Sequence, residues 1–300
     1  MKILITGSTG LLGQALTSHL AQSCEVAGLS RHARDLPGGS RHVTCDLRDA
    51  QQARAAIHEV RPDILIHAQA LSDVDRCERE PEMAWAQNVT TVAHLVQALQ
   101  GSRTLLVYVS TDYVFDGKKG APYEEADAPN PLSVYGRSKL EGERLALGYA
   151  RSIVVRPSTL FGPGRDNFCD AVVCRVRAGQ PVEAFWDQVT SPTYTVDLAE
   201  GIGELSLALW RSWDGERPRR YHLANGGGCT RAAFAERIVE LVGGSRELIR
   251  AIAMADQRRP AARPAYSALA TRAVPSVIGR RLRSWDHALH AYLHQRRWLA

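Results

Sequence analysis

The first 160 residues alternate short apolar segments with segments of helical spacing. The apolar segments, rich in β-branched residues, are 2–6, 25–30, 42–47, 63–70, 104–111 and 152–158. They hold few polar positions, as expected for strands buried on both faces of a sheet. Between them, apolar residues recur at helical intervals, for example at Leu12, Leu16 and Leu20. Alternating strands and helices predict a doubly wound α/β fold, built on a parallel sheet with right-handed crossovers.

The second half of the chain loses this regular alternation. Glycine and proline become frequent from Pro157 to Pro192, which is typical of connecting segments. Further elements are expected as helices at about 196–210, 231–242 and 284–296 and a strand at about 220–224. We therefore expect a sheet domain of residues 1–160, also receiving about 193–224, and a smaller C-terminal substrate-binding lobe of 161–192 and 225–300.

The composition is that of an ordinary globular protein. The chain is 45% hydrophobic and 23% charged, which excludes disordered, collagen-like and coiled-coil classes. No segment approaches the 18 apolar residues needed to span a bilayer, and no signal peptide precedes the first strand. The six cysteines show no CxxC and no repeated spacing, as expected for reduced thiols. We expect a cytoplasmic protein without a membrane partner.

The net charge of +5 suggests an anionic ligand rather than nucleic acid. Of the 37 basic residues, four are lysines, which leaves 33 arginines scattered among 32 acids. The arginines are grouped only in the last 50 residues. That segment lacks the alternation of basic and aromatic residues that is typical of nucleic-acid-binding surfaces. His287, His290 and His294 share one face of the last predicted helix, but the apolar stripe opposite implies that they face solvent. We expect no metal site.

Three glycines follow the first strand directly. Gly7, Gly10 and Gly13 lie in the segment GSTGLLG, which opens the first predicted helix. This spacing permits a tight turn, close approach of the backbone to a pyrophosphate, and close packing of helix on strand. The free amides at the helix start favour the same diphosphate. The pattern predicts an NAD(P)-binding Rossmann domain, with a plain strand-to-helix turn as the alternative.

The second and third strands bear on which dinucleotide is bound. An acid after the second strand would bind the ribose 2′-hydroxyl, but the chain has Ser30 and Arg31, which suit a 2′-phosphate. NADPH is therefore favoured, and NADH stays possible. Asp46 and Leu47 follow the third strand, where they are placed to meet the adenine. Asp46 is equally suited to cap the next helix.

Three residues are candidates for catalysis. Tyr135 and Lys139 are four positions apart in a helical segment, so they share one face. The pKa of a tyrosine must fall by roughly two to three units for acid–base work at neutral pH, and a nearby ammonium favours such a fall. Thr111 ends the fifth strand, at the edge where parallel sheets bind ligands. A surface tyrosine–lysine pair and a strand-capping threonine are the plainer alternatives.

Together these residues resemble a known family. The GxTGxxG turn, the threonine after the fifth strand and the Tyr-x-x-x-Lys pair are similar to the extended short-chain dehydrogenase/reductase superfamily. Segments that resemble the dTDP-4-dehydrorhamnose reductase family are STDYVFDG (110–117), NPLSVYGRSKLEGE (130–143), VDRCEREPEMAWAQN (74–88), DQVTSPTYTVDLA (187–199) and RPAYSAL (263–269). The resemblance spans nearly the whole chain. It implies an NADPH-dependent reductase of a 4-keto nucleotide sugar.

The resemblance also implies roles for matching residues. Tyr135 would protonate the C4 ketone, Lys139 would hold the nicotinamide ribose and lower the pKa of the tyrosine, and Thr111 would polarise the ketone. The residues expected at the cofactor are Gly7, Thr9, Gly10, Leu11, Leu12, Gly13, Ser30, Arg31, Asp46, Leu47, Ala68, Gln69, Ala70, Ser110, Tyr135 and Lys139. Those expected at the substrate are Ser72, Thr111, Asp112, Tyr113 and Thr159, with Arg263 near the diphosphate.

The chain departs from the family pattern at positions that bear on the substrate. A tryptophan usual after the sixth strand is missing from RPST (156–159), and Tyr266 and His67 replace usual asparagines. The keto substrate therefore stays open. A 4,6-dehydratase is disfavoured because Tyr113 follows Asp112 where that enzyme needs glutamate.

Two further alternatives remain beside the reductase. One is a nucleotide-sugar epimerase, or a reductase of another keto substrate. The other is a non-catalytic NADP-binding regulatory subunit that resembles the β subunit of methionine adenosyltransferase. The complete set of Thr111, Tyr135 and Lys139 favours turnover. A homodimer is possible for any of these classes.

Overall fold

The computed structural model describes all 300 residues, and its centre is a seven-stranded sheet in which all neighbouring strands are parallel. The strands, in spatial order, are β11 (Arg220–His222), β6 (Ser152–Arg156), β5 (Leu105–Val109), β4 (Ile64–His67), β1 (Lys2–Thr6), β2 (Glu25–Ser30) and β3 (Arg41–Thr44). The order reverses between β1 and β4, which is where such sheets bind ligands. The predicted doubly wound α/β fold is confirmed.

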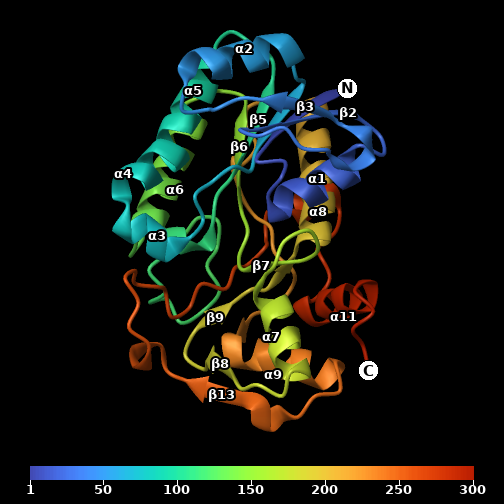
Figure 1. Cartoon of the computed structure of the whole chain (residues 1–300). Coiled ribbons are helices and arrows are strands. Elements are labelled where there is room, and N and C mark those ends of the chain that lie inside the picture. The colour runs from blue at the N-terminus through green and yellow to red at the C-terminus, as the bar shows by residue number, and fades with distance from the viewer.

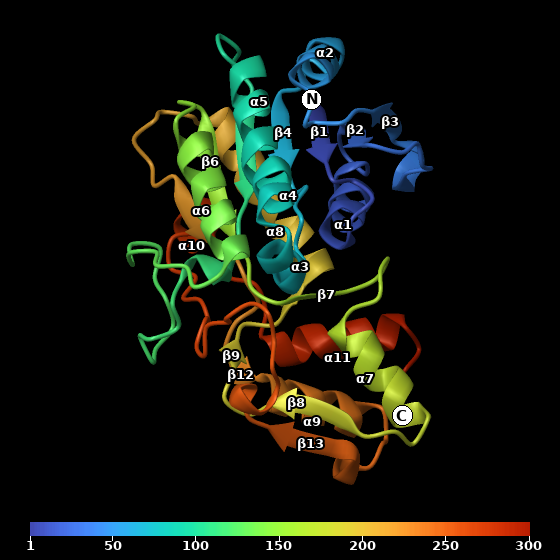
Figure 2. The same cartoon turned by 60° about the vertical axis from the view of Figure 1, so that its left-hand side comes forward.

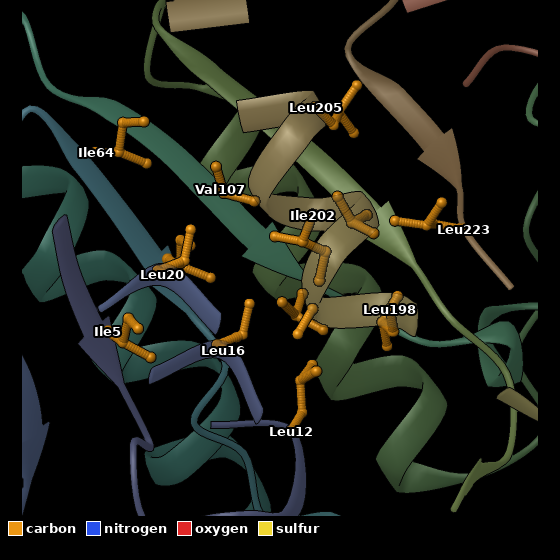
Figure 3. Close-up of a cluster of buried hydrophobic side chains, with 14 of the residues drawn as sticks. Ile5, Leu12, Leu16, Leu20, Ile64, Val107, Leu198, Ile202, Leu205 and Leu223 are labelled. Carbon is orange, nitrogen blue, oxygen red and sulfur yellow. The ribbon is translucent and has the colours of Figure 1, made fainter. Parts of the chain in front are cut away.

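Helices cover both faces of the sheet (Figure 1). The helices on one face are α1 (Leu11–Leu20) and α8 (Thr195–Arg211). Those on the other face are α2 (Ala50–Val60), α5 (Thr91–Ala98) and α6 (Val134–Leu147). Alternate residues of β1 point to opposite faces, so Ile3 and Ile5 join one core and Leu4 joins the other. Figure 3 shows how α1 and α8 fill the first core together.

Short helices connect the strands and the lobe. α3 (Val74–Arg79) and α4 (Pro81–Trp85) follow β4, and a π-helical turn at Ala86–Thr90 leads from α4 into α5. α10 (Pro275–Ile278) lies late in the chain and contacts α8. Val274 and Leu282, in the stretch that the sequence assigns to the lobe, are buried in the first core of the sheet domain.

A smaller lobe lies beyond the carboxyl ends of the strands (Figure 2). Its helices are α7 (Phe168–Arg177), α9 (Arg231–Leu241) and α11 (Trp285–Gln295), which enclose a core of their own. Its strands are β8 (Val182–Phe185), paired in parallel with β13 (Ile249–Ile252), and β9 (Val189–Thr190), paired with β12 (Cys229–Thr230). β7 (Leu160–Phe161) and β10 (Thr193–Tyr194) join it to the sheet domain.

Several predicted strands run past the observed ones at their carboxyl ends. β4, β5 and β6 end at His67, Val109 and Arg156, whereas the apolar segments continue for two to three further residues. Ala68 and Ser110 still donate one backbone hydrogen bond each to a neighbouring strand, at 3.2 and 2.7 Å. Residues just past the ends of these three strands line a cleft. No helix of the chain combines the length and apolar character needed to cross a membrane.

Candidate active site

A cleft of about 910 Å³ opens at the carboxyl edge of the sheet. It is lined by the turns after β1, β2, β4, β5 and β6, by the start of α6, and by residues next to α7 and α9 of the lobe. Most residues expected from the sequence lie there: Gly7, Thr9, Gly10, Leu11, Leu12, Gly13, Ser30, Arg31, Ala68, Gln69, Ala70, Ser72, Ser110, Thr111, Asp112, Tyr113, Tyr135, Lys139 and Thr159. Asp46, Leu47 and Arg263 do not line it.

The glycine-rich turn forms one wall of the cleft. At two of its glycines the neighbouring backbone is so close that no side chain would fit. Gly7 has a φ of +70°, and a Cβ there would lie 2.8 Å from the backbone of Gln69. A Cβ on Gly13 would overlap the carbonyl oxygen of Gly7. α1 starts at Leu11 with no side-chain cap and no acid in its first turn. Its amides therefore remain available to a negatively charged group.

Arginines line the cleft near the carboxyl ends of β2 and β3. Arg31, Arg34 and Arg48 line the cleft beside Ser30. The Ser30 hydroxyl hydrogen-bonds the ring of His42 at 2.9 Å. Neither Arg31 nor Arg34 has a carboxylate partner, whereas Arg48 pairs with Asp46 at 2.5 Å. This end is more basic than the single Arg31 expected from the sequence.

The two residues expected at the adenine do not line the cleft themselves, although Arg48, the partner of Asp46, does. Leu47 is wholly buried in the second core of the sheet domain, so its side chain cannot contact a ligand in the cleft. Asp46 is bound by the guanidinium of Arg48, and this hydrogen bond holds the pKa of its carboxyl below the usual range. Asp49, not Asp46, caps α2.

Tyr135 and Lys139 project from one face of α6 into the cleft. Lys139 is buried, and its Nζ donates to the Val109 carbonyl at 2.8 Å and lies 4.2 Å from the centre of the Tyr108 ring. Burial lowers the pKa of Lys139 to about 7, and the charge of Glu143 opposes this fall. Burial also raises the pKa of Tyr135, which the Thr111 hydroxyl partly offsets. Desolvation of the phenol is the largest influence on this pKa, and Lys139 is not among the groups that shift it.

A buried ion pair lies one helical turn beyond Lys139. Both oxygens of Glu143 accept from the Arg156 guanidinium, at 2.8 and 2.6 Å, and one also accepts from the Ser110 hydroxyl at 2.5 Å. Glu143 and Arg156 are each 1% exposed. The pair ties α6 to β5 and β6, so it fixes the helix that carries Tyr135 and Lys139.

Asp112 forms a second buried polar cluster at the floor of the cleft. Its carboxylate accepts from the hydroxyls of Thr111 at 3.1 Å, Ser158 at 2.8 Å and Ser267 at 2.6 Å. Burial raises its pKa to about 6, although these three hydrogen bonds favour the charged form. The cluster joins the ends of β5 and β6 to the lobe segment at Ser267. Sequence reasoning did not identify Ser158 or Ser267, because only the fold brings them to Asp112.

His67 is buried beside the same elements. Its Nδ1 shares a 2.7 Å hydrogen bond with Thr6, and its ring stacks on that of Tyr108. Burial and the charge of Lys139 lower the pKa of His67 to about 3, so its ring is neutral. Its Nε2 has no hydrogen-bond partner in the protein.

The comparison with known proteins identifies the family. The family described as "RmlD substrate binding domain" matches residues 1–297. The chain belongs to this family. The spore coat polysaccharide biosynthesis protein SpsK of Bacillus subtilis is 33% identical over 299 residues, which cover 98% of each chain. The dTDP-4-dehydrorhamnose reductase of Mycobacterium tuberculosis is 36% identical over 295 residues, covering 96% of this chain and 91% of that one.

A solved structure supports the same assignment. The dTDP-4-dehydrorhamnose reductase from Bacillus anthracis, crystallised in complex with NADP, aligns with a TM-score of 0.86 at 27% identity. The alignment covers 98% of this chain and 99% of that one. The family resemblance read from the motifs is therefore confirmed over the full length of the chain.

Arg263, the basic residue expected from the lobe, does not line the cleft of this family member. Arg263 pairs with Asp75 through two contacts of 2.7 Å, outside the cleft. Arg231, at the start of α9, lines the cleft instead. Its guanidinium lies 3.7 Å from the centre of the Phe168 ring and has no carboxylate partner, and burial lowers its pKa to about 10. The helical pattern predicted α9 but carried no signal that its first residue faces the cleft.

The substrate end of the cleft differs from the expectation in one further respect. Thr159 lines it with a φ of +28°, an unusual backbone conformation for a residue with a side chain. Tyr266, one of the departures from the family pattern, does not line it and instead bridges to Val189.

Proposed function

We propose that the protein is an NADPH-dependent reductase of a 4-keto nucleotide sugar, similar to dTDP-4-dehydrorhamnose reductase. One observation carries the proposal: Thr111, Tyr135 and Lys139 share one cleft with the glycine-rich turn. This arrangement sets hydroxyl, phenol and ammonium groups beside a site for an anionic cofactor. The names of the full-length relatives agree with it.

The residues at one end of the cleft fit NADPH. The free amides of Leu11 and Leu12 suit a pyrophosphate. The guanidinium groups of Arg31, Arg34 and Arg48 suit a 2′-phosphate rather than a bare ribose. When bound, the nicotinamide supplies the hydride. A solved relative holds NADP.

The protein's own groups complete the reduction. The Thr111 hydroxyl donates its proton to Asp112 at 3.1 Å in this structure, and it would turn this proton from the carboxylate to the ketone oxygen to orient that oxygen toward Tyr135. Tyr135 has a raised pKa and therefore stays protonated at neutral pH, ready to donate its proton to that oxygen. The Lys139 ammonium is held at a fixed depth by the Val109 carbonyl, where it can donate to ribose hydroxyls.

The lobe adds positive charge that suits the diphosphate of the nucleotide sugar. Arg231 is a partly buried cation without a carboxylate partner at the cleft wall. Arg165 lines the same cleft without such a partner, whereas Arg76 of α3 already pairs with Glu80 at 3.1 Å. A diphosphate supplies the missing negative charges. These arginines make an anionic nucleotide sugar the favoured substrate class.

The test is NADPH oxidation, followed by absorbance, with purified dTDP-, UDP- and GDP-linked 4-ketosugars. We expect turnover with at least one of them and its loss in Tyr135→Phe, whereas NADPH binding persists. Binding of NADPH without reduction of any ketosugar would contradict the proposal and favour a regulatory subunit. The cytoplasmic location and the homodimer stay predictions.

A further inference from the structure

A second cleft, of about 800 Å³, lies at the amino edge of the sheet, opposite the candidate active site. It is built by the last turns of α2, α5 and α8 and by the residues that precede β4, β5 and β6. Figure 1 shows α2 and α5 at the end of the molecule farthest from the lobe. No residue lines both clefts. A ligand here would therefore not compete directly with one in the first cleft.

Five arginines gather in this cleft: Arg54, Arg61, Arg103, Arg151 and Arg211. None of them lies within ion-pair distance of a carboxylate. The only acidic residue in the lining is Asp63, and one of its oxygens already accepts the backbone amide of Lys2 at 2.8 Å.

The helix ends do not neutralise these arginines. The carboxyl ends of α2, α5 and α8 lie at this edge, and each end of a helix carries roughly half a negative charge. Three helix ends and Asp63 together supply roughly −2.5 charges against five guanidinium groups, by the same measure. A clear positive excess remains, so the cleft favours an anion.

Two indole rings give the cleft an apolar wall. Trp210 and Trp213 line it, with their other sides packed against the first core of the sheet domain. The guanidinium of Arg151 lies 5.5 Å from the centre of the Trp213 ring. Its Nε is buried without a hydrogen-bond partner, although its Nη2 donates to the Trp210 carbonyl at 3.4 Å. A buried donor without a partner is uncommon in native proteins and suggests a missing acceptor.

We propose that this second cleft binds a nucleoside phosphate. Guanidinium groups match the geometry of phosphate oxygens. Indole rings offer the flat apolar surface on which a base stacks. The volume is that of a site for a small molecule. The ligand therefore needs both parts, several phosphate charges and a planar ring.

ATP is the probe that tests the proposal. The protein is first saturated with NADPH, so that the cofactor site is filled, and ATP is then titrated in by calorimetry at low ionic strength. Parallel titrations use inorganic triphosphate and adenosine. We expect saturable binding of ATP at one site and weaker binding of triphosphate and adenosine, because each supplies only half of the recognised chemistry.

The variant that tests the location is the double substitution Arg54→Glu with Arg103→Glu, because both side chains are exposed. The matched control is Arg250→Glu with Arg258→Glu, which makes the same charge change at exposed positions in the lobe. Loss of two charge-assisted contacts should weaken ATP binding by at least about tenfold in the first variant. The control should bind ATP as the wild type does.

Three results would overturn the proposal. The first is an absence of saturable ATP binding to the wild type. The second is equal affinity in the wild type and the Arg54/Arg103 variant, which would place the bound ATP outside the second cleft. The third is triphosphate binding as tight as that of ATP, since the cleft would then recognise phosphate alone.

Discussion

Replacing Glu143 by glutamine should destabilise the protein strongly. The side chain is 1% exposed and holds the guanidinium of Arg156 through both of its oxygens. Glutamine keeps the shape but removes the negative charge, so Arg156 stays in the core without a counter-ion. Arg156 has no other carboxylate within reach, since Glu143 is its only ion-pair partner.

The expected loss follows from the burial of the pair. Removing one partner of a buried ion pair lowers the free energy of unfolding by about 3–5 kcal/mol. Proteins are stable by only about 5–15 kcal/mol. A chain of this size loses roughly 2–4 °C in Tm for each kcal/mol, so Tm should fall by roughly 10 °C.

Glu143→Gln should also change the pH dependence of reduction. The charge of Glu143 raises the pKa of Lys139, so its removal should lower that pKa. The loss of kcat/KM at alkaline pH should then begin at lower pH than in the wild type. A purely structural role would leave this pH profile in place.

Urea unfolding and pH–rate profiles test both effects in four proteins: wild type, Glu143→Gln, Arg156→Met and the double variant. The double variant should be more stable than Glu143→Gln, because it removes the buried guanidinium that Glu143→Gln leaves without a counter-ion. The reasoning fails if Glu143→Gln unfolds within about 1 kcal/mol of the wild type, well below the range for a broken buried pair. It also fails if the double variant is no more stable than Glu143→Gln.

Four further outcomes are expected. Gly13→Ala should abolish NADPH binding in a fluorescence titration, because its Cβ would overlap the backbone of the glycine-rich turn. In the wild type, kcat/KM should decline as pH rises through about 7, where Lys139 loses its proton; a flat profile from pH 6 to 9 would contradict this. Asp112 has a pKa of about 6 in the folded protein against 3.8 as its ordinary value, so the folded state binds more protons in that window. The stability of the wild type relative to Asp112→Asn should therefore fall as pH rises from 3.8 to about 6, and urea unfolding of both proteins across this window measures the difference; a constant difference would contradict the prediction. Arg31→Asp should shift preference from NADPH toward NADH, and an unchanged ratio of the two kcat/KM values would remove Arg31 from the cofactor site.

Most of the fold and part of the site could be predicted from patterns within short stretches of the sequence. The strands at 2–6 and 25–30 match β1 and β2 because the interior of a buried parallel strand is a continuous run of apolar residues, here flanked by Lys2 and Thr6 and by Glu25 and Ser30. The glycine-rich turn was recognisable from its spacing alone, and the backbone that excludes a side chain at Gly13 belongs to Gly7 and Ser8, only a few residues earlier. The spacing of Tyr135 and Lys139 is likewise a property of one helix.

Features that depend on distant contacts could not be predicted in this way. Arg263 was expected in the cleft, but Asp75, almost 190 positions earlier, takes it as a partner. Arg231 takes the place at the cleft because α9 docks with its first residue toward the sheet. The raised pKa of Tyr135 reflects the depth of its burial, which spacing alone does not encode.

The route of the chain between its two parts has a consequence for synthesis on the ribosome. β11 completes the edge of the sheet next to β6 only with residues 220–222 of 300, and Leu282 closes the core beneath α8. The cofactor half is therefore not an autonomous N-terminal fragment. A nascent chain must expose an unpaired β6 edge while the first strands of the lobe emerge. A truncation after residue 160 should yield an aggregating sheet rather than a small NADPH-binding domain.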